Sequence, residues 1–373
     1  MNMSGSRRMA IESAHTADTA ALSTGSAESP KAELRSGVTS PPLIRTSERA
    51  AFNRCRWAWN LSYLQELRPK RSGPALRFGT LVHEALAAYY KIGRKRGPHP
   101  SKTFLEVYER DVKEAGEFFV YNEDEGTFED EKWLDAREMG AELLEMYVEE
   151  YGTDKNWEVL ATEQPFQVPV RNPRTSRVLF HYAGILDLVM REISTNRVWI
   201  WDHKTTAAVD LTALGLNEQF GSYWAFGVQW LREQGIIHPR YFDDLSGLMV
   251  NYLRRARRDD RPRNALGQSL NKDGSVSKRQ QAPIFHREPT WRTDHDRDEV
   301  VRRALNDHRE MEMVKRGDLA LRKNPSPWNC RGCAWLDVCE LHETGHDWEI
   351  MLNGTTESWS PYDEHEIRDA EQK

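Results

Sequence analysis

Several features that would assign this chain to a common protein class are absent. No apolar run is long enough to span a bilayer, and the first residues lack the continuous apolar stretch of a secretory signal. We therefore expect a cytoplasmic protein without membrane contacts. Four cysteines in 373 residues are too few for a disulfide scaffold. In a reducing compartment, clustered cysteines more often bind metal than pair with each other.

Two further absences concern nucleic acids. The chain has no G-x4-G-K-S/T phosphate-binding loop, which argues against a helicase motor within it. The net charge of −6 shows no general excess of positive charge, so any contact with nucleic acid must depend on local patches. Residues 1–42 contain few large apolar side chains and are expected to form a disordered tail. Residues 346–373 are expected to form a second tail.

The hydrophobic pattern predicts an α/β fold with a central mixed sheet flanked by helices. Residues 43–157 read as a helical block, in which Ser47 caps a first helix that contains Cys55, and a second helix at 78–90 carries His83. Period-two patterns within 158–320 predict adjacent strands, with another helix between them and a long helix near the end. The further predicted helices span 101–120, 130–151, 212–232 and 291–315, and the later strands span 245–252 and 282–286.

Acidic residues occur in two of the predicted strands, where charge needs an explanation. Asp187 lies in the apolar run GILDLV, and an unpaired buried carboxylate costs several kcal/mol. Asp202 ends the next strand, and Lys204 follows on the same face while His203 points away. Two carboxylates and the carbonyl of His203 suit Mg²⁺, with Lys204 left to orient or activate water. The alternative is an ion pair of Asp202 with Lys204 and a turn at Asp187.

The order of these motifs resembles the PD-(D/E)XK nuclease superfamily and its RecB-like branch. The carrying motifs, over residues 43–342, are G-T-L-V-H, G-x-x-D, D-x-K-T and Q-x3-Y. The resemblance implies a restriction-endonuclease-like core and metal-dependent cleavage of DNA. It implies that Mg²⁺ or Mn²⁺ binds His83, Asp187 and Asp202, that Lys204 assists the attacking water, and that Gln219 and Tyr223 position the DNA backbone. Asp202 stands where many relatives carry glutamate, and both are allowed. Glu163 is either a further acid near the metal or a surface residue.

Three of the four cysteines form the pattern Cys330-x2-Cys333-x5-Cys339 within the predicted segment 321–345. Proline and glycine in this segment permit the tight turns that bring sulfur atoms together. With Cys55 as the fourth ligand, the arrangement resembles the 4Fe-4S clamp of AddB-type and CRISPR-associated RecB-like exonucleases. Zinc bound by four thiolates is the chemical alternative.

Basic segments supply candidate contacts to DNA phosphates. Six arginines stand between Arg254 and Arg263, followed by Lys272, Lys278 and Arg279; Asp259 and Asp260 interrupt this run, so a solvated loop is the alternative. A second patch spans residues 68–77.

We expect an exonuclease acting on single-stranded DNA or DNA ends in recombination, repair or CRISPR-type processing, with a possible helicase or recombination partner. The alternatives are a non-catalytic DNA-binding accessory of the same fold and a zinc-stabilised hydrolase.

Overall fold

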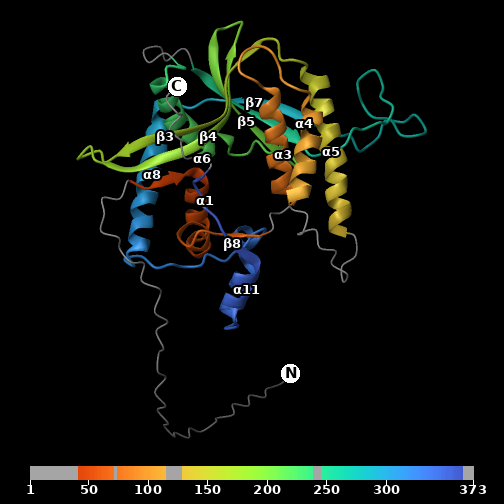
Figure 1. Cartoon of the computed structure of the whole chain (residues 1–373). Helices are drawn as coiled ribbons and strands as arrows, with labels where there is room; N and C mark the ends of the chain where they lie inside the picture. The colour runs from red at the N-terminus through yellow and green to blue at the C-terminus, as the bar shows by residue number, and fades with distance from the viewer. Residues whose placement is uncertain (1–40, 71–73, 115–127, 238–244, 364–373) are drawn as a thin grey trace, which may run out of the picture. The chain divides into compact units, whose positions relative to one another are not determined.

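Six strands form one mixed sheet in this computed structural model, which describes residues 41–70, 74–114, 128–237 and 245–363 (Figure 1). The strand order is β1-β4-β5-β6-β7, and β3 pairs with the other edge of β4. The pairs β1–β4 and β5–β6 are parallel, and the remaining pairs are antiparallel. The strands are β1 (Leu43–Arg45), β3 (Trp157–Arg171), β4 (Val178–Glu192), β5 (Arg197–Thr206), β6 (Leu245–Arg254) and β7 (Phe285–Thr290).

Helices cover both faces of this sheet because its central strands are apolar on both sides. In β5, Trp199 and Trp201 pack with helices α3, α4 and α5, whereas Val198 and Ile200 pack with α1, α6, α7 and α8. Figure 1 shows α3, α4 and α5 side by side. The bounds are α1 (Thr46–Arg54), α3 (Pro74–Tyr89), α4 (Pro100–Glu114), α5 (Phe128–Tyr151), α6 (Glu218–Ser222), α7 (Val228–Glu233) and α8 (Asp294–Lys315). The predicted α/β class with a flanked mixed sheet is confirmed.

Several element boundaries differ from the sequence prediction, and four of the differences have a local explanation or change a predicted role. Ser47 does not cap the first helix, which starts at Thr46 without a side-chain cap, and Cys55 is not inside it but follows its last residue in an extended conformation. The helix predicted at 212–232 starts at Glu218, because the Asn217 side chain accepts hydrogen bonds from the first backbone amides. The last strand covers 285–290 instead of 282–286. Residues 115–120 of a predicted helix lie outside the described residues, as do residues 1–40 of the predicted tail.

A small lobe joins the two ends of the described chain. It contains α2 (Arg56–Trp59), the π-helical turn η1 (Asn60–Leu64), α9 (Pro327–Cys330), α10 (Leu336–Glu343) and α11 (Trp348–Thr355), and it includes a two-stranded sheet of β2 (Leu67–Pro69) and β8 (Thr356–Ser358). Its apolar core is formed by Trp57, Ala58, Leu61, Trp335, Val338 and Leu352. The segment from residue 346 on, which the sequence predicts as a tail, contains α11 and β8. It folds because Leu352 packs in the core of the lobe and β8 pairs with β2.

None of the helices in the described part of the chain combines the length and the apolar character needed to cross a bilayer.

Candidate active site

The predicted carboxylates lie where the sheet opens between β4 and β5. The pairing of these strands begins at Glu192 and Arg197 and ends at Leu188 and Trp201. On the same side of β4, β1 pairs only with residues 181–183. Asp187 therefore lies in the middle of β4, beside this opening. The backbone N–H of His203 reaches across it to Asp187 Oδ2 at 2.9 Å.

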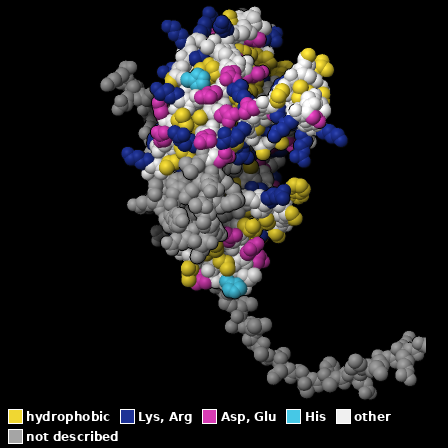
Figure 2. All heavy atoms as spheres, turned by 90° about the vertical axis from the view of Figure 1, so that its right-hand side faces the viewer, with side chains coloured by type: hydrophobic (Ala, Val, Ile, Leu, Met, Phe, Trp, Pro, Cys, Tyr) yellow, Lys and Arg dark blue, Asp and Glu magenta, His cyan; other side chains and the backbone are white. Residues whose placement is uncertain are grey.

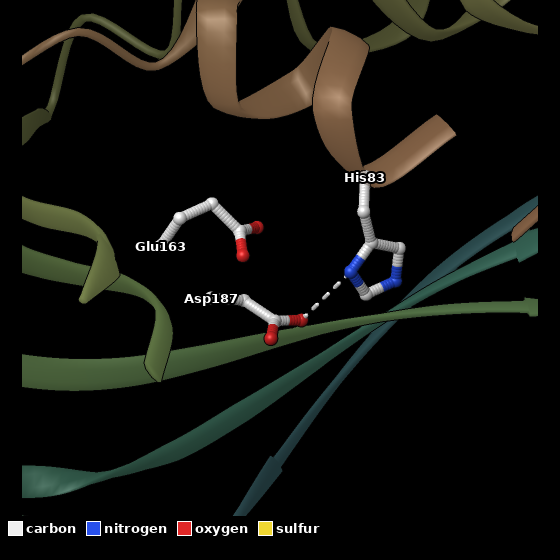
Figure 3. A group of neighbouring side chains, drawn as sticks. All are labelled: His83, Glu163 and Asp187. Carbon is white, nitrogen blue, oxygen red and sulfur yellow. Dashed lines mark ion pairs between the residues drawn. The ribbon is translucent and has the colours of Figure 1, made fainter. Parts of the chain in front are cut away.

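Three side chains from separate elements meet at this opening: His83 from α3, Glu163 from β3 and Asp187 from β4 (Figure 3). Their nearest ligand atoms all lie within 4.8 Å of one another, and His83 Nδ1 is 3.4 Å from Asp187 Oδ2. Within the described residues this is the one such group of three histidine, cysteine or acidic residues. Imidazole nitrogen and carboxylate oxygen are ligands for divalent ions, so the group fits a metal site.

The sequence allows two roles for Glu163, and the structure places its side chain beside His83 and Asp187. Its φ of 42° lies in the left-handed region, which costs a non-glycine residue about 1–3 kcal/mol. Such strain concentrates at functional sites. The local sequence carries no sign of this conformation, because it depends on how β3 pairs with β4.

Burial makes the charge on Asp187 unfavourable. Asp187 is 8% exposed and Asp202 is 2% exposed. Burial, and then the nearby charge of Asp202, raise the pKa of Asp187 to about 6. Asp202 Oδ2 is buried and accepts no hydrogen bond of regular geometry from the described residues, although Lys204 Nζ lies 2.8 Å away. A divalent cation between the two carboxylates would offset both costs.

Asp202 and Lys204 occupy the opposite side of β5 from the ring of His203. Lys204 Nζ donates to Gln219 Oε1 at 2.8 Å, and Gln219 Nε2 donates to Asp202 Oδ1 at 3.0 Å. The Tyr223 hydroxyl donates to the same oxygen at 3.2 Å. Burial alone would lower the pKa of Lys204, but the Asp202 carboxylate raises it above its usual value, so the amine stays protonated. Gln219 and Tyr223 therefore hold the Asp202–Lys204 pair in place.

Tyr223 begins the π-helical turn η3 (Tyr223–Gly227), which interrupts the helix that the sequence predicts as continuous. Such turns widen a helix by one residue and occur frequently at functional sites. Here the turn begins at the last residue of Gln219-x3-Tyr223, and both side chains of this motif reach Asp202.

His203 contributes its backbone to the site and its ring to the core. The ring is 2% exposed, stacks on Tyr90, and lies with Nδ1 2.9 Å from the Asn251 amide nitrogen. The N–H of His203 points toward β4, and in a strand the N–H and C=O of one residue point to the same side. The His203 carbonyl therefore faces the opening, in agreement with the predicted role of this carbonyl as a metal ligand.

Gly79 lets α3 approach β5 closely and so positions His83 one turn later. A Cβ on Gly79 would lie 3.0 Å from Thr205 Oγ1. We expect Gly79→Ala to shift α3 by a few tenths of an ångström and to lower cleavage about 10-fold. The free energy of unfolding should change by less than about 1 kcal/mol, because alanine favours the helix. Cleavage rates and thermal melts test this, with Gly354→Ala in α11, where a Cβ meets open space, as the control.

Replacing the Glu163 carboxylate is expected to weaken metal binding. Glu163→Gln should lower Mn²⁺ affinity about 10- to 100-fold, since an amide is a poorer ligand and leaves less negative charge. Isothermal titration calorimetry measures the affinity. Glu158→Gln is the matched control on the same strand, because Glu158 pairs with Arg191 away from the site. Equal Mn²⁺ affinity in the two variants would show that Glu163 does not bind the metal.

The four cysteines line a single cavity in the lobe. Cys330, Cys333 and Cys339 border it together with Cys55, and all four are free thiols. The turn after Cys330 depends on Gly332, whose φ is 67°. Hydrogen bonds from Asn324 to the Arg54 carbonyl and from Trp57 N to the Arg322 carbonyl bring the C-terminal segment against the α1–α2 corner. Cys55 reaches the cavity because the chain is extended there.

The side chain of Lys323 also borders this cavity, and one of the thiols is partly buried there. Lys323 Nζ lies 3.2 Å from the Cys339 carbonyl and 4.7 Å from the centre of a Trp57 ring. Burial raises the pKa of the Cys339 thiol, and the nearby Lys323 opposes this. Four thiols around one cavity suit a metal ion or an inorganic cluster.

Comparison with protein families agrees with this geometry. The family model of the PD-(D/E)XK nuclease superfamily matches residues 46–340, which include the candidate metal-site residues and all four cysteines. No curated protein matches the chain. The central mixed sheet flanked by helices is consistent with the restriction-endonuclease-like fold of that superfamily. The match covers well over half of the sequence, and the chain therefore belongs to the PD-(D/E)XK nuclease superfamily.

Proposed function

We propose that this protein is a Mg²⁺- or Mn²⁺-dependent exonuclease that cleaves single-stranded DNA or DNA ends and carries a structural 4Fe-4S cluster. The observation that carries the proposal is the convergence of His83, Glu163 and Asp187 at the opening of the sheet, beside the Asp202–Lys204 pair. Superfamily membership supports a nuclease that hydrolyses phosphodiester bonds.

The metal would be held by His83, Asp187 and Asp202, with Glu163 and the His203 carbonyl close by. When bound, the ion supplies Lewis-acid chemistry at the phosphoryl group. Lys204 is protonated and is held by Asp202 and Gln219, so it can donate a hydrogen bond to the attacking water or to a phosphate oxygen. Its positive charge would stabilise the negative charge that develops in the transition state.

Gln219 and Tyr223 take a positioning role in this proposal. Both side chains are hydrogen-bonded to Asp202, and Tyr223 is buried. The resemblance assigns them to the DNA backbone, and a rearrangement on substrate binding would be needed for Tyr223 to reach it. A helicase or a recombination protein remains the proposed partner, since the chain lacks a motor motif of its own.

The arrangement of the thiols along the chain supports a cluster over zinc. Cys55 stands near the N-terminal end of the described chain, Cys330, Cys333 and Cys339 stand together near the other end, and all four line one cavity. This one-plus-three arrangement resembles the 4Fe-4S clamp of AddB-type and CRISPR-associated RecB-like exonucleases. Zinc bound by four thiolates is the chemical alternative.

A cleavage assay on end-labelled oligonucleotides, performed anaerobically, tests the function. Wild-type protein should degrade single-stranded DNA with Mn²⁺ or Mg²⁺, and EDTA should abolish this. Oligonucleotides blocked at the 5′ or the 3′ end distinguish an exonuclease from an endonuclease. Asp202→Asn should bind DNA without cutting it. DNA binding by the wild type with no cleavage under any metal would instead indicate a non-catalytic DNA-binding module.

A further inference from the structure

The segment between β6 and β7, residues 255–284, projects from the sheet as an ordered arm. Figure 1 shows it extending past α5. We call it the β6–β7 arm. It starts at the end of β6, where Arg254 pairs with Thr206 of β5, two residues beyond Lys204. Because β5 and β6 are parallel, the arm leaves the sheet at the same end of the strands at which Lys204 lies.

Ion pairs hold the root of this arm against α5, and on the face of the molecule seen in Figure 2 basic and acidic side chains are interspersed. Arg257 pairs with Asp135 and Glu142, and Arg258 pairs with Glu149 at 2.6 Å. These arginines were expected from the sequence to contact DNA phosphates. The structure gives them carboxylate partners instead, more than 100 residues away in the sequence. Two arginines of the second basic patch, at residues 68–77, also have carboxylate partners. Arg68 pairs with Glu357, and Arg77 pairs with Asp111.

Hydrogen bonds between polar side chains order the outer part of the arm, which has few apolar residues. Asp259 accepts bonds from Arg261 and from the Ser269 hydroxyl. Gln280 bonds to the backbone of Ser269 and Ser277, both of which are buried. An arm held in this way can bind a ligand without first paying the entropy of becoming ordered.

The outer part of the arm presents positive charge to solvent. Residues 261–284 contain five lysines or arginines and a single acid, in a chain whose net charge is −6. Lys272, Lys278 and Arg279 are exposed, and within the described residues none of them forms an ion pair. The acid, Asp273, is engaged by Ser275. A rigid surface of unpaired cations fits a polyanion with regularly spaced charges.

We propose that the β6–β7 arm binds the phosphate backbone of the DNA substrate outside the cleavage site, through Lys272, Lys278 and Arg279. The proposal rests on the proposed function, because it takes DNA as the polyanion. Arg254, at the root of the arm, is the register partner of Thr206, two residues beyond Lys204, so DNA that leaves the site on this side would meet the arm. The arm therefore adds affinity for longer substrates and takes no part in the chemistry.

The test compares two triple variants with the wild type. Lys272→Ala/Lys278→Ala/Arg279→Ala removes the arm charges. The matched control, Lys155→Ala/Arg174→Ala/Arg177→Ala, removes three exposed charges before β3 and at the β3–β4 turn. DNA binding is measured in EDTA by fluorescence anisotropy across a salt series, with a long oligonucleotide and with one just long enough to fill the site. Thermal melts establish that the variants are folded.

For the long oligonucleotide, the arm variant should show a slope of log K against log salt that is smaller by about 2, from three lost phosphate contacts. Its affinity should fall at least about 10-fold, while affinity for the short oligonucleotide and the maximal cleavage rate stay unchanged. A salt slope equal to that of wild type would overturn the proposal, because it would show that these three side chains release no counterions from DNA. Absence of cleavage by the wild type would overturn the proposed nuclease activity alone, because binding is measured without turnover.

Discussion

Lys204→Ala is expected to reduce metal-dependent DNA cleavage on the order of 10³-fold while DNA affinity changes little. Lys204 is the cation nearest to Asp202, at 2.8 Å, and it is held in place by Gln219. Its charge would act mainly on the transition state, so kcat should fall and KM should stay near that of wild type. Single-turnover cleavage and anisotropy binding measure the two quantities separately.

The same variant has an expected effect on stability. Removing the amine leaves Asp202 buried without its ion-pair partner, and a stranded buried charge costs several kcal/mol. Lys204→Ala should therefore melt at a lower temperature than wild type in EDTA, and Mn²⁺ should restore part of the difference. Lys155→Ala is the control, because Lys155 is exposed and lies before β3, outside the candidate site. Wild-type cleavage rates in Lys204→Ala would remove this lysine from the mechanism.

Cys55→Ser is expected to remove the proposed cluster and to lower the melting temperature on the order of 10 °C. In the proposal, Cys55 is the ligand contributed by the N-terminal part, and the other three thiols come from one C-terminal segment. Without Cys55, the proposed cluster would no longer join the two ends of the chain. The visible absorption and the bound iron of the anaerobically purified protein are measured beside its thermal melt.

Ala334→Ser is the matched control for this variant, because it adds a hydroxyl to the same segment at an exposed position without touching a thiol. It should keep the colour and iron of wild type. A colourless wild type with stoichiometric zinc would show that the cavity holds zinc. Retention of iron by Cys55→Ser, together with its loss in Cys330→Ser, would show that the cluster is held by the C-terminal segment alone.

The cysteine lobe is connected to the active site through a short path. Cys55 follows α1, α1 follows β1, and β1 pairs with β4 at residues 181–183, four residues before Asp187. Arg49 in α1 also pairs with Glu218 beside Gln219 and with Asp307 of α8. If Cys55→Ser loosens the lobe, α1 loses part of its support and the opening of the sheet is disturbed. The variant should therefore lower cleavage as well as stability.

Local pattern was enough to predict most elements. The strands carrying Asp187 and Asp202 follow from period-two apolar runs, and the helix carrying His83 follows from 3.6-residue periodicity. The errors lie at ends of helices and strands whose position depends on contacts with residues distant in the sequence. The first helix ends before Cys55 where the chain turns toward the cysteine cavity, and residues after 346 fold because β2 offers a partner strand.

The sequence alone determined the chemical types at the site, because the ordered histidine, aspartates, lysine and cysteines can be read without coordinates. Tertiary structure decided where they meet. The opening between β4 and β5, the strained Glu163 beside His83, and the contacts of Gln219 and Tyr223 with Asp202 all depend on pairing between distant segments. The same holds for the arginines of the β6–β7 arm, since acids on α5 neutralise some of them and leave others to solvent. Charge can be counted along a sequence, but its partners are set by the fold.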